Sequence, residues 1–443
     1  MSGDTIFHRL EHVDSATLLA LHQSNPLRYP ALFESAGVAS NYDILFACPQ
    51  ERLIAMPASA ERFLGELDDA WRAHRISDTR SKLPFSGGWL FFVAYDFAQY
   101  IEPKLSLPAS TLPVAEAVRM PAAIVLDRNN NRAWIVAERA FAECIETILD
   151  DLKKADRISE SQQSIIAGEI EEEEARRYLE SVARALDYIA AGDIYQANLS
   201  RLWRARLRPE AQPIDLFKRL RRTNPGPFSG IASLTDRTIV TSSPERLVRV
   251  RDGWVETRPI AGTRPRGVDA ASDGELAREL RAHPKEQAEH VMLIDLERND
   301  LGRICDAGTV RVDEFMTIET YAHVHHIVSN VRGRLREGVT PGEIIKAVFP
   351  GGTITGCPKV RCMQIIGELE GVPRGAYTGS LGYLNRDGSM DSNILIRTLE
   401  VVGREISLRA GAGIVADSIP DRELQETRAK ARGLLRALTD GAD

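Results

Sequence analysis

The chain has 443 residues, of which 43% are hydrophobic and 27% are charged, and its formal net charge is −7. This composition is typical of soluble globular proteins, and the acidic balance gives no reason to expect nucleic acid or an anionic membrane surface as a partner. The length allows one very large domain or two to three ordinary ones.

The cysteine pattern and the N-terminus bear on the cellular compartment. The five cysteines are scattered without a CxxC pair, so neither a zinc site nor a disulfide framework is expected. A reduced, cytoplasmic compartment fits best. No basic stretch followed by an apolar run opens the sequence, so we expect no signal peptide. No stretch reaches the roughly 18 apolar residues of a membrane-spanning helix, and Gly88 to Ala94 is predicted to be a buried strand.

Residues 1 to about 150 alternate short β-rich runs with helical ones. Strands are predicted at Asp43 to Cys48 and at Ala122 to Asp127, and apolar spacing predicts a helix over Ala60 to His74. The polar segment from about Lys153 to Ile170 is predicted to be a connector or helix end. Glu169 and residues 171–174 are then expected to open a helix to about Ala191, because acidic side chains favour helix N-termini.

The chain from Gly192 onward is denser in short strands, many of them separated by Gly, Pro, Asn or Asp turns. The predicted strands are Tyr195 to Arg206, Gly230 to Ser233, Thr238 to Ser242, Leu247 to Arg251, Val255 to Thr257, Thr309 to Phe315, His325 to Arg332, Ser380 to Asn385, Ile394 to Val402 and Ile406 to Ala410. The predicted helices are Ile214 to Arg222, Gly274 to Arg303, Pro341 to Val348, Pro358 to Leu369 and Pro420 to Leu438. This pattern predicts an α+β fold with large antiparallel sheets and helices against their outer faces.

Two of the predicted helices carry glutamates three residues apart, a spacing that places both carboxylates on one helix face. They are Glu286 with Glu289, and Glu423 with Glu426, which Lys430 follows four residues later. Such pairs are typical of solvated helix faces. Two helices with facing carboxylates would also suit Mg²⁺, which prefers a few carboxylates with waters and substrate oxygens. The spacing alone leaves both interpretations open.

Six short segments follow one another between about residues 170 and 435. They are Gly192 to Ser200, Ser243 to Arg246, Arg258 to Thr263 (RPIAGT), Asp295 to Asp300, Phe349 to Arg361 (FPGGTITGCPKVR) and Gly411 to Ser418. In this order they resemble the signatures of the chorismate-utilising enzymes, whose N-terminal part Asn25 to Ala36 and Gly87 to Trp89 resemble more loosely. The resemblance implies a large sandwich of two stacked antiparallel sheets with the active site between them. Residues 1–150 would be its N-terminal part and residues 170–443 its chorismate-binding catalytic region, within one structural domain.

The resemblance also implies roles for residues at matching motif positions. Glu289 and Glu426 match Mg²⁺ ligands, and Glu286 and Glu423 match supporting acids beside the metal. Glu245 matches the general acid that protonates the leaving hydroxyl at C4 of chorismate, and His326 matches an active-site histidine. The substrate pocket is matched by Tyr377, Arg397, Lys430 and the backbone around Gly262, Thr263, Gly411 and Gly413.

The chemistry of the substrate accounts for these residue types. Chorismate is a dianion, so it calls for cations and for backbone N–H groups at glycines that allow close approach. Hydroxide is a poor leaving group, and a buried carboxylic acid at Glu245 would supply its proton. From the residues alone other interpretations stay open: a surface partner of Arg246 for Glu245, a strand-end surface residue for Arg397, and a core residue for His326.

Two positions bear on which reaction follows. Relatives that add water typically carry a lysine where this chain has Gln196, and glutamine cannot act as a base, so hydroxylation is disfavoured. In many aminodeoxychorismate synthases the position of Ala261 holds a lysine that attacks the substrate, whereas alanine has no nucleophile. The two aminating branches remain, namely aminodeoxychorismate synthases, with a 4-amino product, and anthranilate synthases, with a 2-amino product.

The motifs divide between these branches. Ala261 resembles the anthranilate branch, whereas Gly352 to Gly356, Gly379 to Tyr383 and Asp391 to Arg397 resemble the aminodeoxychorismate branch across more positions. We therefore expect component I of an aminodeoxychorismate synthase with a non-lysine nucleophile, which serves 4-aminobenzoate and folate synthesis. Component I of an anthranilate synthase is the alternative. An inactive scaffold is disfavoured, because the residues that match the acid, the metal ligands and the substrate cations are all present.

Two further partners are implied by the resemblance. The chain has no glutaminase nucleophile motif, so a separate glutamine amidotransferase subunit is expected to deliver ammonia. Leu32 to Ser35 (LFES) and Asn224 to Phe228 resemble the tryptophan-binding pocket of anthranilate synthases, which would use Leu32, Glu34, Ser35 and Pro225. Simple packing is the alternative for both segments.

Overall fold

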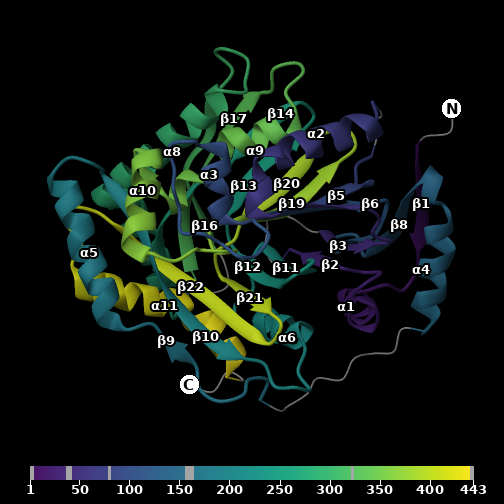
Figure 1. Cartoon of the computed structure of the whole chain (residues 1–443), viewed down its shortest axis with the longest axis horizontal. Helices are drawn as coiled ribbons and strands as arrows, with labels where there is room; N and C mark the ends of the chain where they lie inside the picture. The colour runs from purple at the N-terminus through teal and green to yellow at the C-terminus, as the bar shows by residue number, and fades with distance from the viewer. Residues whose placement is uncertain (1–3, 36–41, 78–80, 155–163, 321–323, 440–443) are drawn as a thin grey trace.

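The computed structural model describes residues 4–35, 42–77, 81–154, 164–320 and 324–439. Two large antiparallel sheets lie face to face, and helices cover their outer faces (Figure 1). The α+β class and the two stacked sheets predicted from the sequence are thereby confirmed. In the part of the chain that the structure describes, no helix combines the length and the apolar character needed to cross a membrane.

The first sheet has twelve strands among the described residues, and β9 pairs with β10 beside the main path. In spatial order they are β1 (Thr5–Leu10), β8 (Arg132–Glu138), β7 (Ala122–Asp127), β3 (Tyr42–Ala47), β2 (Ala31–Glu34), β11 (Phe228–Ser233), β12 (Thr238–Ser243), β21 (Thr398–Val402), β22 (Glu405–Ile414), β10 (Gln196–Arg206) and β18 (Gly356–Cys357), with β9 (Glu171–Glu172).

The second sheet has ten strands within the same described ranges, and β16 pairs with β17 beside the main path. In spatial order they are β15 (Ile260–Pro265), β17 (Val324–Arg334), β14 (Trp254–Thr257), β13 (Arg246–Arg251), β20 (Met390–Ile394), β19 (Ser380–Asn385), β5 (Gly88–Val93), β6 (Ala115–Met120) and β4 (Arg52–Ala55), with β16 (Arg311–Thr320). Both sheets therefore combine strands from before residue 139 with strands from after residue 195.

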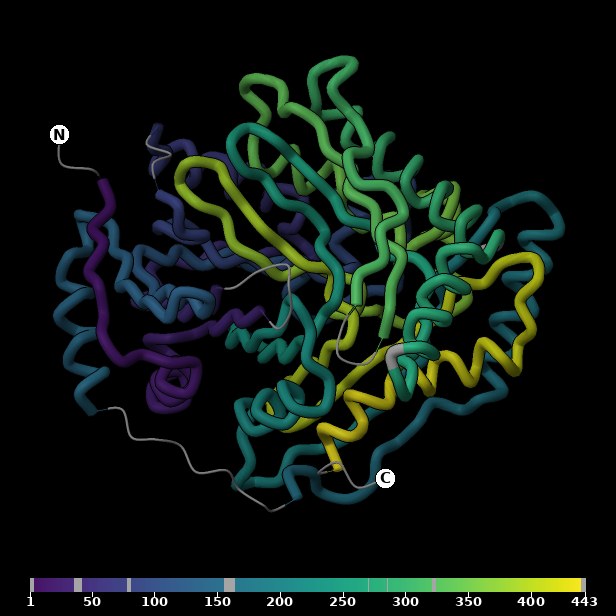
Figure 2. The backbone as a smooth tube through the Cα atoms, turned by 180° about the vertical axis from the view of Figure 1, so that it is seen from behind, coloured from purple at the N-terminus to yellow at the C-terminus, as the bar shows by residue number. Residues whose placement is uncertain are grey.

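The helices pack against the outer faces of the two sheets. They are α1 (Ser15–Ser24), α2 (Phe63–His74), α3 (Ala98–Ile101), α4 (Glu143–Lys154), α5 (Ala175–Ala190), α6 (Pro213–Thr223), α7 (Ala270–Ala282), α8 (Pro284–Gly302), α9 (Pro341–Val348), α10 (Lys359–Glu370) and α11 (Pro420–Leu438). Short 3₁₀ turns lie at Pro57–Arg62, Tyr95–Phe97, Arg139–Phe141 and Gly352–Ile354. The edge strand β1 and the last helix α11 lie at opposite ends of the molecule in both backbone views (Figures 1 and 2).

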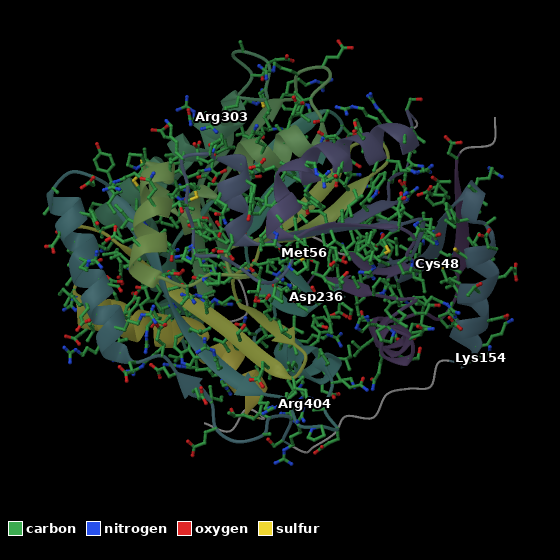
Figure 3. All side chains as sticks on the ribbon, viewed as in Figure 1. Cys48, Met56, Lys154, Asp236, Arg303 and Arg404 are labelled. Atoms are coloured by element: carbon green, nitrogen blue, oxygen red, sulfur yellow. The ribbon has the colours of Figure 1, made fainter. Side chains whose placement is uncertain are left out.

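The core is layered in the same way as the elements. One cluster of buried apolar side chains joins the facing sides of the two sheets and includes Phe46, Phe92 and Leu381. Other clusters lie between each sheet and its helices. Side chains thus fill the layers between the ribbons (Figure 3). Burial of this apolar surface is the main driving force for stacking the sheets.

Several predicted elements have the observed bounds, among them Ala122–Asp127, Ser380–Asn385, Pro341–Val348 and Pro420–Leu438. Three predicted elements differ from the structure in more than a few end residues. Of the polar segment predicted near Lys153 to Ile170, residues 155–163 lie outside the described residues, and α4 ends just before them.

The helix predicted over residues 274–303 is two helices. Pro284 lacks an N–H and disfavours the helical conformation at the residue before it, and His283 accordingly has an extended backbone (φ −72°, ψ 113°). The helix expected to open at the acidic run 171–174 begins instead at Ala175, because Glu171 and Glu172 pair as a short strand with β10.

The strand predicted over Ile394 to Val402 is interrupted and forms β20 and β21. Arg397 between them has a left-handed backbone (φ 53°), which no regular strand accommodates. The interruption lets the chain leave the second sheet and enter the first, since β20 belongs to one and β21 to the other.

A buried ion cluster fastens the end of α10 to β10 and β22. The Glu370 carboxylate accepts hydrogen bonds from Arg374 Nη2 (2.6 Å), from Arg409 Nη2 (2.9 Å), and from the N–H and hydroxyl of Ser200 (both 2.9 Å). Arg374 Nη2 also donates to the carbonyl of Asn198 (2.6 Å). One carboxylate therefore holds two buried guanidinium groups and a strand.

We expect Glu370→Ala to destabilise the fold by about 3–5 kcal/mol, because it leaves two buried cations without their shared carboxylate. Glu368→Ala removes an exposed carboxylate from the same helix and is expected to cost less than about 1 kcal/mol. Urea unfolding followed by fluorescence measures both. Equal losses in the two variants would contradict the importance of the buried cluster.

Candidate active site

The β10–β22 ladder brings one group of predicted site residues together. Asn198 lies opposite Gly413, and Ser200 opposite Gly411. A Cβ on Gly413 would lie 2.5 Å from Gln196 Nε2, and one on Gly411 would lie 2.8 Å from the Tyr377 hydroxyl oxygen. Both positions therefore need glycine, because any side chain would displace these polar groups.

Gln196 links this ladder to helix α8. Its Nε2 donates to Glu289 Oε1 (2.7 Å). This hydrogen bond holds the side-chain amide with its own oxygen, Oε1, directed away from Glu289. That oxygen is buried and has no hydrogen-bond partner among the described residues. The site thus contains an acceptor that is available to a ligand.

A second group of predicted residues lies on β15 and β17. The register between these strands shifts between Ala261 and Thr263, and Gly262 between them has a left-handed backbone (φ 65°). A Cβ on Gly262 would lie 2.8 Å from Glu286 Oε2, so this glycine lets the strand approach α8. The Thr263 hydroxyl pairs with His326 Nδ1 (2.9 Å).

His326 and Ala261 are both buried in this second group. Burial lowers the pKa of His326 to about 4, so its ring is neutral near pH 7. Ala261 pairs with Ile327 and brings no titratable group to the site. The arrangement offers a hydrogen-bonding imidazole rather than a cation or a side-chain nucleophile.

Glu245 lies between β12 and β13 and is 4% exposed. Burial raises the pKa of its carboxyl to about 8, against polar contacts with Thr353 and the Ile260 N–H. The interpretation of Glu245 as a surface partner of Arg246 is wrong, because Arg246 forms a two-point ion pair with Asp391 (2.9 and 3.2 Å). At neutral pH the Glu245 side chain is therefore an acid that can give a proton.

Arg397 and Lys430 connect the interruption after β20 to helix α11. The Arg397 guanidinium donates to the carbonyl oxygen of Lys430, and Lys430 Nζ lies 2.7 Å from Glu426 Oε1. Burial lowers the pKa of Arg397, and the neighbouring Tyr377 and Glu426 oppose that effect. Two cations thus lie close to the glycine-lined ladder.

The four glutamates predicted to serve a metal ion have different partners. Glu286 Oε1 lies 3.3 Å from Arg264, Glu289 accepts from Gln196, and Glu426 pairs with Lys430, while Glu423 is half-buried on α11. No group of three or more His, Cys, Asp or Glu side chains in the described ranges is spaced to hold a metal ion. The donors suit Mg²⁺ only as an open site, in which substrate oxygens and waters complete the coordination.

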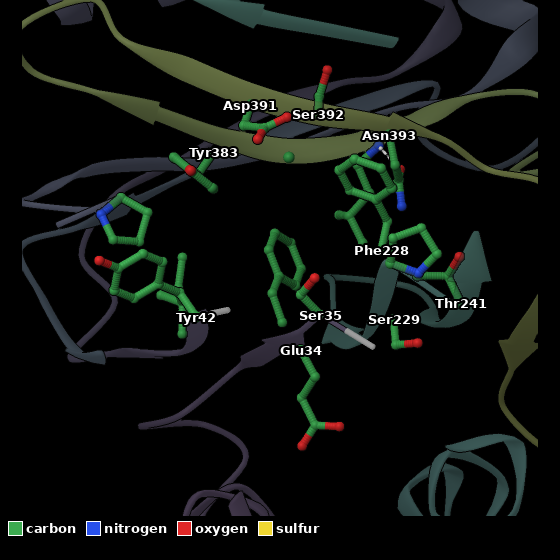
Figure 4. A pocket seen from close by; sticks show the side chains of 16 residues that line it. Glu34, Ser35, Tyr42, Phe228, Ser229, Thr241, Tyr383, Asp391, Ser392 and Asn393 are labelled. Carbon is green, nitrogen blue, oxygen red and sulfur yellow. Dashed lines mark hydrogen bonds between the residues drawn. The ribbon is translucent and has the colours of Figure 1, made fainter. Parts of the chain in front are cut away.

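A separate cavity opens between the two sheets (Figure 4). Its walls include Phe33, Ser35, Tyr42, Phe228, Tyr383 and Asp391. Of the four residues predicted for a tryptophan pocket, Glu34 and Ser35 line this cavity, and Leu32 and Pro225 do not.

The alternation of side chains along β2 places Leu32 and the Glu34 carboxylate on one face and Phe33 and Ser35 on the cavity face. Leu32 is fully buried in the core on the other side of the sheet. The Glu34 carboxylate points away from the cavity and lies 2.7 Å from Arg221 Nε (Figure 4). Ser35 faces the cavity, and its hydroxyl oxygen has no hydrogen-bond partner within the described part of the chain.

Two polar residues of the site were not singled out from the sequence. Asn198 lies two residues after Gln196 on β10, and its Oδ1 is 2.6 Å from the position of a Cβ on Gly411. Glu297 is a buried carboxyl beside the segment that precedes α10. Asn198 could have been found from strand alternation, which places residues i and i+2, here Gln196 and Asn198, on one face.

Comparison with known proteins adds to this geometry. Residues 28–436 match the family model of chorismate binding enzymes. The chain is 40% identical to aminodeoxychorismate synthase component 1 of Bacillus subtilis, over 83% of this chain and 81% of that protein. It is 44% identical to anthranilate synthase component 1 of Thermus thermophilus, over 80% of this chain and 78% of that protein.

The fold is similar to that of a solved structure, anthranilate synthase component I from Streptococcus pneumoniae. The two chains superpose with a TM-score of 0.79 at 31% sequence identity, covering 90% of this chain and 93% of the other. Relatives with both kinds of name therefore match this chain at similar identity.

Proposed function

Because the chain belongs to the family of chorismate-binding enzymes, we propose that it is component I of an aminodeoxychorismate synthase. The substrate is chorismate, and the product is 4-amino-4-deoxychorismate, a precursor of 4-aminobenzoate and folate. The observation that carries the proposal is the buried carboxyl of Glu245, whose pKa burial raises to about 8, in a site that also has a glycine-lined ladder and two cations.

The 4-amino product is favoured over the 2-amino product by the motifs on β19, β20 and the segment 352–356. Anthranilate synthase component I is the second candidate, and Ala261 favours it, because this position offers no nucleophile. Gln196 disfavours hydroxylation of the substrate in either case, since a carboxamide cannot take a proton from water.

The proposed reaction exchanges a hydroxyl for an amine. Glu245 gives its proton to the C4 hydroxyl, the C4–O bond breaks, and water leaves. Ammonia supplies the electron pair of the new C–N bond and then releases one proton, which balances the proton that Glu245 gave. Because Ala261 has no nucleophile, no covalent intermediate forms at this residue, and ammonia attacks the substrate directly.

Binding of the dianionic substrate is assigned to cations and backbone amides. Arg397 and Lys430 supply positive charge to a substrate carboxylate, and the N–H groups around Gly411, Gly413 and Gly262 approach the carboxylate oxygens. Glu289 and Glu426, with Glu286 and Glu423 beside them, would hold Mg²⁺, which supplies positive charge to a substrate carboxylate. Tyr377 is buried with a raised pKa of about 12 and therefore acts as a neutral hydroxyl donor.

One protein partner follows from the proposed reaction. A separate glutamine amidotransferase subunit is proposed to deliver ammonia, as the name "component 1" of the relatives suggests. Free ammonium salts are expected to replace that subunit at high concentration. A cytoplasmic location remains our proposal from the reduced cysteines.

Incubation of the chain with chorismate, Mg²⁺ and ammonium is expected to yield an amine of the mass of aminodeoxychorismate. It should give 4-aminobenzoate, detected by fluorescence, only after a lyase is added. Release of anthranilate and pyruvate without a lyase would make the second candidate correct. Absence of any amine would refute both.

Glu245→Gln is expected to lower kcat by about 10²- to 10⁴-fold, because the amide cannot donate the proton to the leaving hydroxyl. Wild-type activity should be retained below pH 8 and lost as the pH rises through the pKa of Glu245, about 8. Glu275→Gln, an exposed change on α7, should leave the rate at each pH unchanged. Equal rates for wild type and Glu245→Gln at pH 7 would contradict the assignment.

The cavity between the sheets is proposed to bind tryptophan, because aromatic walls and the Ser35 hydroxyl suit an aromatic amino acid. We expect tryptophan to raise the melting temperature of the wild type. Ser35→Ala should weaken binding by about tenfold, since it removes one hydrogen-bonding group, whereas Ser59→Ala on the surface should not. Thermal shift and calorimetry check this, and an unchanged melting temperature would remove the proposal.

A further inference from the structure

A second buried carboxyl lies close to Glu245 and has no part in the reaction as described so far. Glu297 is on α8 and is 5% exposed. The N–H of Gly352 donates to its Oε1 (3.3 Å), and a Cβ on Gly352 would lie 3.2 Å from the same oxygen. The glycine therefore lets the segment before α10 lie directly on this carboxyl.

The same short segment packs against Glu245 from its other side. A Cβ on Gly351 would lie 2.7 Å from Ile394, whose N–H donates to the carbonyl of Glu245 (3.0 Å). Thr353 makes a polar contact with the Glu245 carboxyl. Gly352 thus contacts the Glu297 carboxyl and Thr353 the Glu245 carboxyl, so neighbouring residues of one short turn border both groups.

The cation nearest to Glu297 is already engaged by a different carboxylate. Lys359 forms an ion pair with Asp300, one turn after Glu297 on α8, and donates to the carbonyl of Pro350 (2.9 Å). Arg303 at the end of α8 lies 3.7 Å from the other oxygen of Asp300. The positive charge of Lys359 is therefore shared, and it offsets the charge of Glu297 only in part.

The charged groups that face the two carboxyls are few. Asp300 and Lys359 act on Glu297, which also has polar contacts with Thr257 and the Gly352 N–H, and Glu297 and Lys430 act on Glu245. Burial, followed by the charge of Asp300, raises the pKa of Glu297 to about 7. Two neighbouring carboxyls in a weakly polar environment resist double ionisation, so a negative charge on Glu297 favours the protonated form of Glu245.

We propose that Glu297 is a positioning residue for the reaction, whose negative charge keeps Glu245 in its acid form. This inference rests on the proposed role of Glu245 as the proton donor. It gives a role in the reaction to the glutamate in the segment Asp295 to Asp300 (DLERND).

The test compares Glu297→Gln with Asp295→Asn, which removes the same charge from an exposed position two residues earlier on α8. Amination is measured from pH 6 to 9.5 at a fixed concentration of free ammonia, so that the ratio of variant to wild-type rate isolates the enzyme's own titration. Glu297→Gln should shift the alkaline limb of the profile down by about one pH unit, because a repelling charge is lost. Asp295→Asn should leave that limb in place.

Two results in this assay would overturn the proposal. One is a loss of rate in Glu297→Gln that is the same at every pH, as expected of a merely structural residue. The other is an unchanged profile. Glu297→Asp keeps the charge and should restore the wild-type alkaline limb, so a shifted limb in that variant also counts against the proposal.

A second measurement does not depend on turnover or on folding of Glu297→Gln. Carboxyl ¹³C NMR of the wild type, with the Glu245 signal assigned by its loss in Glu245→Gln, should show Glu245 titrating above Glu297. Titration of Glu245 below pH 6 would overturn the inference about Glu297. If the wild type instead makes no amine from chorismate, the proposed function fails, while this titration still decides the interaction between the two carboxyls.

Discussion

The antiparallel ladder between β10 and β22 is the constraint on which the site depends. It pairs ten consecutive residues, from Ala197 with Ile414 to Arg206 with Glu405. Because side chains alternate across a strand, a slip by one residue would exchange the two faces of the ladder. In the observed register Gly411 and Gly413 share the face of Gln196 and Asn198, and the apolar residues between them pack beneath α5 and α10. The Glu370 cluster contacts both strands, through Ser200 on β10 and Arg409 on β22, and stabilises this register.

The placement of the site between two sheets also explains its chemistry. Burial raises the pKa of Glu245 and lowers that of His326, so the same environment yields a protonated carboxyl and a neutral imidazole near pH 7. Positive charge is supplied by Arg397 and Lys430, which contact each other at α11. An acid on one side and cations on the other suit a dianion that must lose a hydroxyl. Pairs of groups whose environments push their pKa values apart are the usual arrangement in acid–base sites.

The sequence predicted local features well, because their causes are local. The bounds of α9 and α11 follow from Pro341 and Pro420 at the first helical positions, where the missing N–H costs nothing. The break at Arg397 was missed, since a left-handed arginine has no signal in a run of β-branched residues. The pairing of β15 with β17 depends on residues some 65 positions apart in the sequence and on a register shift at Gly262, so it could not be read from spacing.

The positions of several site residues could be predicted from the sequence, but their surroundings could not. Motif positions located Glu245, Gln196 and the glycines, but burial and pairing were visible only in the structure, as Arg246 and its partner Asp391 illustrate. The glutamate spacing predicted carboxylates on a common helix face and could not reveal that Glu289 and Glu426 are engaged by Gln196 and Lys430. Strand alternation alone would have separated Leu32 from Ser35, which face opposite sides of the sheet.

The central claim is that chorismate binds on the β10–β22 ladder with its C4 hydroxyl toward Glu245. A crystal structure of Glu245→Gln with chorismate and Mg²⁺ tests it most directly, because the slow variant should retain the unreacted substrate. We predict the C4 oxygen within hydrogen-bonding distance of residue 245, and the metal ion between a substrate carboxylate and the carboxylates of α8 and α11. Substrate bound elsewhere, or with C4 turned away from residue 245, would contradict the account.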